Sequence, residues 1–227
     1  MLKTLKDWAG ARPPGSTTLT GRWVDLHPLS AAQHTRSLWQ AVLGHDEVWE
    51  WLGDGPYIRE EDFFTALEAK ENGSAARFFA ILPRQASGAA GAATGYASLM
   101  RMDAPNGVIE VGNVMFSPQL QRTPAATEAM YLMARYVFEE LGYRRYEWKC
   151  NALNLPSRRA ALRLGFTFEG IFRQHMVIKG QNRDTAWFSM LDSEWPERKR
   201  AFEAWLAPAN FDGDGRQRKA LSELREH

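Results

Sequence analysis

The chain has 227 residues, 44% of them hydrophobic and 12% aromatic, so it can build a substantial core and lacks the composition of a disordered chain. Its 28 basic and 27 acidic residues nearly cancel, which gives no overall electrostatic basis for binding nucleic acid. The single Cys150 excludes an internal disulfide, and no apolar run is long enough for a helical membrane span or a signal peptide, so we expect a cytoplasmic protein without a membrane partner.

Apolar periodicity divides the first half of the chain into strands and two helices. Residues 1–20 contain several Pro, Gly and Thr and are expected to form an N-terminal arm. Ser30 is a candidate N-cap for the first helix, and the Gly-rich segment 84–93 is expected to be a flexible loop. The predicted elements are a strand at 22–26, helices at 31–43 and 59–72, and strands at 76–82, 95–102 and 107–116.

The second half contains the clearest helical pattern. Residues 124–141 carry one apolar stripe that ends at Gly142. The elements predicted after it are a strand at 143–150, a helix at 156–164, a hairpin of strands 166–178 and 184–191, and a helix at 194–206. This order predicts a mixed α/β (α+β) domain at 21–195 around one twisted sheet, followed by a C-terminal helix and polar tail at 196–227.

The start of the long helix is a candidate anion site. Thr123 suits the N-cap, and Pro124 suits the first helical position, where a missing N–H costs nothing. The free N–H groups that follow and the nearby Arg122 would attract an anion such as a pyrophosphate. An ordinary capped helix start explains the same residues.

Residues 121–129, QRTPAATEA, resemble the coenzyme A pyrophosphate loop of GNAT acetyltransferases, Q/R-x-x-G-x-G/A. Gln121 matches its first position and Ala126 its last, whereas Pro124 replaces the middle glycine and removes one N–H donor. The next residues resemble the T-E-A of the ribosomal-protein N-acetyltransferase branch. Further on, 151–157 resembles the N-x-x-S segment that faces coenzyme A, and 164–170 matches L-G-F-x-x-E-G.

This resemblance implies the GNAT fold, a twisted, mixed and mostly antiparallel sheet flanked by helices. It implies acetyl-CoA as cosubstrate and an amine as acceptor, either a protein N-terminus or a small molecule. The residues that it places at the coenzyme are Val114, Met115, Phe116, Gln121, Arg122, Thr123, Ala125, Ala126, Thr127, Asn154 and Arg158.

Two residues are candidates for catalysis. Glu110 resembles the acidic residue of the family's E-x-G motif and is the expected general base, with a solvated strand residue or a structural partner for an arginine as the alternatives. Ser157 is the expected hydrogen-bond partner of the leaving thiolate, although it could simply cap a helix. The tyrosine that many relatives place before L-G-F corresponds here to Ala161.

Trp49, Trp51 and His175 are expected to face the acceptor, although such aromatic residues also fill cores. The five histidines show no ligand spacing, so no metal is expected. A homodimer through the late hairpin is left open. The alternative function is a non-catalytic acyl-CoA-binding sensor on the same fold.

Overall fold

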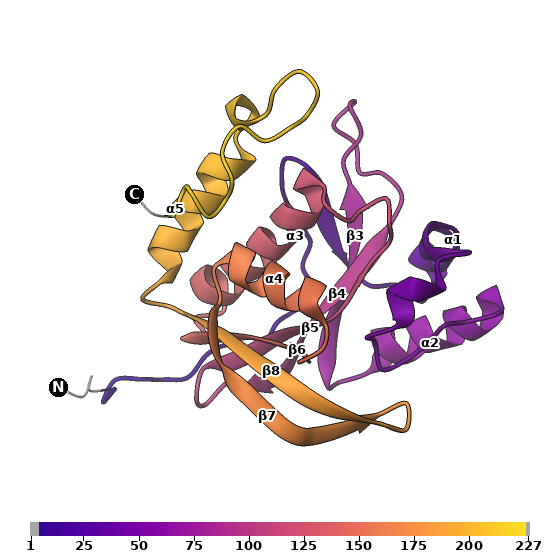
Figure 1. The fold of residues 1–227 in the computed structure, drawn as a ribbon, viewed down its shortest axis with the longest axis horizontal. Helices are drawn as coiled ribbons and strands as arrows, with labels where there is room; N and C mark the ends of the chain where they lie inside the picture. The colour runs from indigo at the N-terminus through magenta and orange to yellow at the C-terminus, as the bar shows by residue number, and fades with distance from the viewer. Residues whose placement is uncertain (1–4, 226–227) are drawn as a thin grey trace.

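One sheet of eight strands organises residues 5–225, the part of the chain that the computed structural model describes (Figure 1). Its spatial order is β1-β2-β3-β4-β5-β6-β8-β7, and β5 with β6 is the parallel pair among antiparallel neighbours. This is the mixed, mostly antiparallel sheet that the sequence predicts. The strands are β1 (Leu19–Thr20), β2 (Val24–Pro28), β3 (Ala76–Pro83), β4 (Gly95–Asp103), β5 (Val108–Phe116), β6 (Arg145–Asn151), β7 (Thr167–Ile178) and β8 (Gln181–Leu191).

Helices cover both faces of the sheet (Figure 1). The helical segments are α1 (Ala31–Val42), η1 (Asp46–Trp49), α2 (Glu60–Asn72), α3 (Pro124–Arg135), η2 (Tyr136–Glu140), α4 (Leu155–Leu164), α5 (Trp195–Leu206) and η3 (Pro208–Asn210). The α1–α2 pair packs with alternate residues of β3, such as Phe78 and Ala80, while α3 and α5 pack with the intervening residues, such as Phe79 and Ile81. Because successive side chains of a strand point to opposite faces, β3 contributes to two separate cores, one on each face of the sheet.

The long helix begins where the sequence predicts it. Thr123 is the N-cap, with its hydroxyl 3.1 Å from the N–H of Ala126, and Pro124 occupies the first helical turn. The α-helix changes to a π-turn at Tyr136–Glu140, so the predicted 124–141 segment is one helical run with two hydrogen-bonding patterns. Ser30 differs from expectation: its side chain makes no capping bond, and its N–H instead donates to Nδ1 of His34.

Both ends of the described chain pack against the domain. The expected arm contributes β1, and the indole of Trp8 donates to the carbonyl of Pro105. In the polar tail, Leu221 is buried, and Gln217 accepts from the indole of Trp205. The tail is polar overall, but single apolar residues within it are buried and hold it against the domain. The tail therefore covers α5.

The sheet opens between β5 and β6. Their ladder runs from Val108 with Arg145 to Val111 with Trp148 and stops there, although both strands continue. Beyond that point two residues of β5, Asn113 and Val114, oppose a single residue of β4. This bulge, with Asn113 at φ 49°, turns the end of β5 away from β6.

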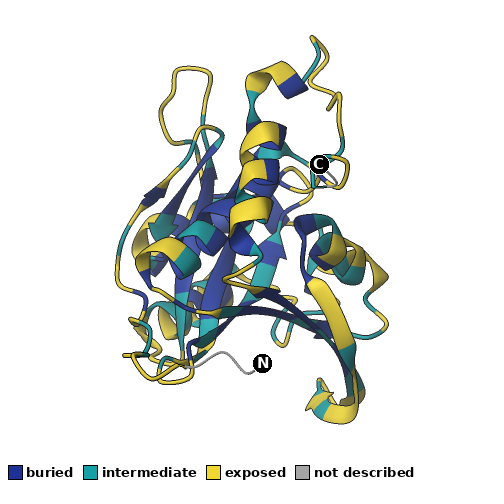
Figure 2. Ribbon diagram, turned by 90° about the vertical axis from the view of Figure 1, so that its left-hand side faces the viewer, coloured by how far each residue is buried: buried dark blue, intermediate teal, exposed yellow. Residues whose placement is uncertain are grey.

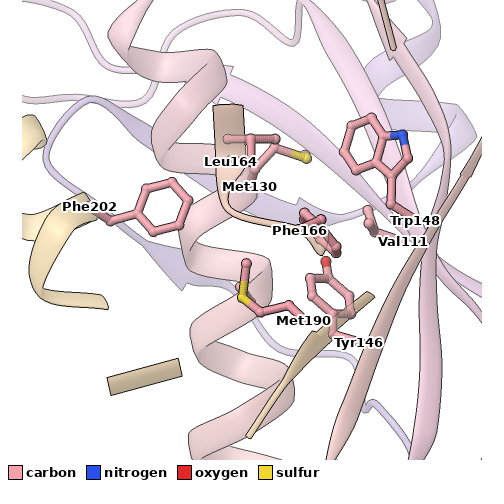
Figure 3. A pocket seen from close by; sticks show the side chains of 9 residues that line it. Val111, Met130, Tyr146, Trp148, Leu164, Phe166, Met190 and Phe202 are labelled. Atoms are coloured by element: carbon pink, nitrogen blue, oxygen red, sulfur yellow. The ribbon is translucent and has the colours of Figure 1, made fainter. Parts of the chain in front are cut away.

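A small cavity of about 10 Å³ lies below this opening, among side chains of the sheet, α3, α4 and α5 (Figure 3). Its lining is apolar except for the hydroxyl of Tyr146, which has no partner in the described structure. The space suits about one water molecule and no larger ligand. This cavity is therefore too small to be the candidate site, and the opening of the sheet above it is considered next.

Candidate active site

The start of α3 offers backbone donors to an anion. By its position Ala125 has no intrahelical partner for its N–H, while the N–H of Ala126 already bonds to Thr123. Arg122, in the left-handed region at φ 62°, has an exposed side chain beside this turn. One free N–H, a helix dipole and a guanidinium suit a phosphate group.

Other predicted residues of this loop have structural contacts. The side-chain amide of Gln121 donates to the carbonyl of Phe116 at 2.9 Å and so ties the loop to the end of β5. The hydroxyl of Thr127 is buried and accepts from Arg163 of α4 at 3.2 Å. Thr127 therefore joins α3 to α4 through its side chain, and its contact with a coenzyme stays a prediction.

The end of β5 borders the opening. The side chains of Val114 and Phe116 pack towards the α3 core, whereas that of Met115 is fully buried under α1 and α2. Residues 112–116 have no strand partner on the β6 side. Their backbone can therefore bond to an extended ligand, which fits the pantetheine arm of coenzyme A.

On the β6 side, α4 presents polar groups. Asn154 caps this helix by accepting from the N–H of Ser157 at 3.0 Å. The hydroxyl of Ser157 accepts from the indole of Trp148, also at 3.0 Å, and can donate its own hydrogen towards the sulfur of Cys150. Arg158 is half-buried and donates to the carbonyl of Ala152. Burial raises the pKa of the neighbouring Cys150 thiol, as expected for an inert cysteine.

Glu110 lies on the sheet face opposite α3, among cations. Its carboxylate is 2.8 Å from Arg101 and 2.8 Å from the buried ammonium of Lys149. It also lies beside the bulge, because a Cβ on Gly112 would be 3.3 Å from its Oε1. Glu110 is thus buried and paired with an arginine, as one alternative from the sequence has it, and it also lies beside the bulge, while its role as a base stays a prediction.

The ion pairs continue across the sheet as a chain. Lys149 also contacts Glu147 at 2.6 Å, and Arg145 joins Glu147 to Glu169. The Arg145 guanidinium lowers the pKa of the Glu169 carboxyl, which also accepts from Ser189. Cations and carboxylates alternate along this chain, so each charge is matched.

Aromatic rings cover the chain of ion pairs at β7 and β8. Trp187 lies 3.8 Å below the ammonium of Lys149 and stacks on Phe172 with a centroid distance of 4.4 Å. His175 is exposed beside them, and its Nδ1 lies 3.0 Å from the hydroxyl of Thr185. Partial burial, followed by the charges of nearby cations, lowers the pKa of His175, so the imidazole is neutral at neutral pH.

The expectation for Trp49 needs correction. Its side chain is 2% exposed and packs edge-on against Tyr57 and Phe63, so it belongs to the core under α1 and α2. Only its backbone reaches the site, where its carbonyl accepts from Lys179 at the tip of the β7–β8 hairpin. Trp51 is half-buried near the same tip. The sequence could not show which of these two tryptophans is buried, because the segment around them has neither the alternation of a strand nor the periodicity of a long helix.

Sequence reasoning missed Arg101, Lys149 and Arg183, all of which lie on this face. The sequence pattern could have indicated Lys149, because the alternation in 145–150 places it on the same strand face as Glu147, opposite Tyr146 and Trp148. Arg101 had none, because a second bulge of β4 sets its direction. A hollow of about 540 Å³ lies elsewhere, lined by residues such as His27, Gln33 and Arg77, and holds none of the predicted site residues.

Two kinds of feature are absent from residues 5–225. No helix there is both long and apolar enough to cross a membrane. Nor do three side chains of His, Cys, Asp or Glu gather there as a metal site requires.

Residues 24–167 match the family model described as an acetyltransferase (GNAT) domain. The chain is 48% identical to a GCN5-related N-acetyltransferase from Brucella melitensis, whose crystal structure superimposes with a TM-score of 0.93 over 98% of this chain and 100% of that one. A probable GNAT-family acetyltransferase from Chromobacterium violaceum is 40% identical, with a TM-score of 0.79 over 86% and 96% of the two chains. YdaF of Bacillus subtilis, provisionally named a ribosomal N-acetyltransferase, is 29% identical over 48% of this chain and 59% of its own length.

Proposed function

Because the chain belongs to the GNAT family of acetyltransferases, which use acetyl-CoA, we propose that it transfers the acetyl group directly to an amine at the opening between β5 and β6. One observation carries this proposal: the opening between β5 and β6 adjoins two different surfaces. On one side lie the α3 N-terminus and α4, and on the other lies the face with Glu110. Acetyl-CoA supplies an acetyl group activated as a thioester.

The chain's own backbone would position and polarise the reacting carbonyl. Residues 114–116 lie at the bulge and beyond it and lack a β6 partner, so those of their N–H groups that do not bond to β4 are the proposed donors to the oxygen on which negative charge develops. Ala125, Ala126 and Arg122 at the α3 start would hold the phosphates, with Asn154 and Arg158 on the α4 side.

Glu110 is the proposed general base, acting through a water molecule. Its carboxylate borders the bulge, but Arg101 and Lys149 occupy it, so a bridging water is a better proton carrier than direct contact. In the reaction the amine nitrogen bonds to the carbonyl carbon, the carbon–sulfur bond breaks, and the amine proton passes to the water and Glu110. Ser157, oriented by Trp148, would donate a hydrogen bond to the departing thiolate.

The acceptor belongs to one of two classes. The relationship to YdaF supports a ribosomal or other protein N-terminus. The exposed rings of Phe172 and His175 at the opening would equally contact a small amine. A cytoplasmic location and a homodimer are further parts of this proposal.

The test is a thiol-release assay with acetyl-CoA over small amines and N-terminal peptides, comparing Glu110→Gln with the parent chain. We expect kcat to fall by about 10²-fold or more, because general-base catalysis contributes about 10²–10⁴-fold. Glu169→Gln is the matched control, since it removes a carboxylate from the same face but farther along the chain of ion pairs.

Thermal stability with and without acetyl-CoA provides the second readout, since a ligand of the folded state raises the midpoint. We expect the same midpoint shift for both variants as for the parent. Unchanged turnover in Glu110→Gln would remove Glu110 as the base and leave neutral His175 as the next residue to test. A coenzyme-dependent shift without turnover of any amine would favour a binding module.

A further inference from the structure

Arg183 is a half-buried cation without a partner in the described structure. It lies on β8 next to the point where β6 ends, because Asn151 pairs with Thr185 and Ala152 donates to the carbonyl of Asp184. Its Nε is buried and bonds to nothing. The adjacent Asp184 carboxylate does not neutralise it, because that carboxylate accepts from the N–H of Gln174 and from Asn182 instead.

The guanidinium of Arg183 lies at the opening of the sheet. Its charge interacts with Cys150 on the α4 side and with Arg101 and Glu110 on the other face. Burial lowers its pKa, which reports the unfavourable removal of its charge from water. A buried or half-buried ion is stable when a counter-charge or hydrogen-bond acceptor replaces the lost water.

The protein supplies no spare counter-charge on this face. The three cations Arg101, Lys149 and Arg145 alternate with the three carboxylates Glu110, Glu147 and Glu169, and each contact is 2.5–2.8 Å long. Arg183 is therefore a positive charge that this chain of ion pairs leaves unneutralised. His175 beside it is neutral at neutral pH and cannot compensate.

We infer that Arg183 binds an anionic group, in the first instance a carboxylate, carried by the acceptor amine. This inference rests on the proposed function. The coenzyme is a poor candidate for this contact, because its pantetheine arm and acetyl group are uncharged and its phosphates fit the α3 start. A guanidinium presents paired donors that match a carboxylate, so it would also fix the orientation of the acceptor. Phe172 pairs with Thr185, two residues from Arg183 along β8, and stacks on Trp187, so these rings suit an apolar or aromatic part of the same molecule farther along the strand.

The test compares amines that differ only by a carboxylate: phenylalanine against 2-phenylethylamine, tryptophan against tryptamine, and peptides with Asp against Asn at the second position. For the parent chain we expect kcat/KM at least about tenfold higher for the acidic member of at least one pair, as a charge-assisted contact implies. Arg183→Gln should abolish that preference and leave the neutral member unchanged. Arg173→Gln, an exposed arginine of the same hairpin, should keep the preference.

Three results would overturn the inference. One is equal kcat/KM for the acidic and neutral members in every pair. Another is an acidic preference that Arg183→Gln leaves intact. The third is loss of the acetyl-CoA-dependent midpoint shift in Arg183→Gln, which would assign the residue to the coenzyme.

Failure of the proposed function is distinguishable from failure of this inference. If no amine is acetylated, the same pairs are titrated in thermal-stability measurements with coenzyme A present. Stabilisation by the acidic members that disappears in Arg183→Gln would support the anion site without any turnover. Equal midpoints for acidic and neutral members would overturn it.

Discussion

Two glutamates, one in β5 and one in α3, differ in what their carboxylates contact. Glu110 borders the opening and shares its oxygens with two cations. Glu128, within the T-E-A sequence, is buried in α3 and accepts from the backbone N–H groups of Arg22, Trp23 and Val24. Buried backbone donors give Glu128 a structural role, whereas Glu110 is paired with side-chain cations and its catalytic role stays a prediction.

We predict that Glu128→Gln lowers the free energy of unfolding by about 3 kcal/mol. An amide keeps one acceptor oxygen but turns N–H donors towards other N–H donors, and hydrogen bonds to a charged group contribute about 1.5–3 kcal/mol each. Urea unfolding followed by tryptophan fluorescence measures the change. Glu140→Gln, at an exposed carboxylate of the same helical run, should change stability little. Equal midpoints for the two variants would show that the three N–H contacts contribute nothing.

Ser157→Ala should lower kcat about tenfold while leaving the KM for acetyl-CoA nearly unchanged. The hydroxyl is oriented by the indole of Trp148 and would donate only when negative charge develops on the leaving sulfur. Steady-state thiol release measures both constants. Ser189→Ala removes a hydroxyl from the other face, where it donates to Glu169, and serves as control. A rise in KM with constant kcat would instead make Ser157 a ground-state contact.

At the residue scale, sequence reasoning succeeded where local rules decide and failed where long-range packing decides. The Thr123–Pro124 helix start follows from local geometry and was predicted. The burial of Trp49 depends on Tyr57 and Phe63 closing around it, which no local pattern encodes. The proposed roles of Glu110, Ser157 and the coenzyme-contacting residues stay predictions.

Among the elements, β5 shapes the candidate site, because its last residues stay paired with β4 after they have separated from β6. Pairing of Gly95 with Phe116 and of Tyr96 with Met115 holds the end of β5 on β4 after the bulge. Its departure from β6 therefore creates an opening without an unsupported strand. The helix and strand order was predictable because each long element has clear periodicity, whereas the bulge at Asn113 was not, since it depends on the count of residues in the facing strand.

Gly95→Ala should destabilise the protein by about 1–3 kcal/mol, as overpacking in a core does. An added Cβ would lie 2.6 Å from the carbonyl oxygen of Met115 and 2.7 Å from Leu120, and the backbone oxygen cannot move without disturbing the end of β5. The acetyl-CoA-dependent midpoint shift should shrink in the same variant. Gly213→Ala, with open space around the new methyl group, is the control. An unchanged coenzyme shift would show that β5 does not depend on this contact.

At the scale of the molecule, β7 is an exposed edge of the sheet (Figure 2). Phe168, Ile171 and Val177 on it are 42%, 43% and 76% exposed, an arrangement that favours pairing with a second chain. For the proposed homodimer we expect light scattering to give twice the chain mass, and Val177→Lys to shift the population towards monomer. Ile58→Lys, at an exposed apolar position outside the sheet, should not. A monomeric parent chain at high concentration would contradict the proposal.

The stability of the whole molecule should decrease on mild acidification because of His34. Burial, together with the nearby His27, lowers the pKa of this imidazole below 6.5, and its Nδ1 accepts from the N–H of Ser30. Above 6.5 neither the folded nor the unfolded state binds the proton, so the stability is fully present. As the pH falls below 6.5, His34 binds a proton in the unfolded state but not in the folded state. The free energy of unfolding therefore decreases.

Urea unfolding at about pH 7.5 and about pH 5.5 measures this loss in a window where most carboxylates remain ionised. His34→Gln can keep an acceptor for Ser30 but has no titrating group, so it should lose less stability between the two pH values than the parent. His45→Gln, at a more exposed histidine, should follow the parent. His175, whose pKa is also lowered, is present in every variant, so the comparison isolates His34. An equal loss in His34→Gln and the parent would mean that the acid sensitivity of the fold arises elsewhere.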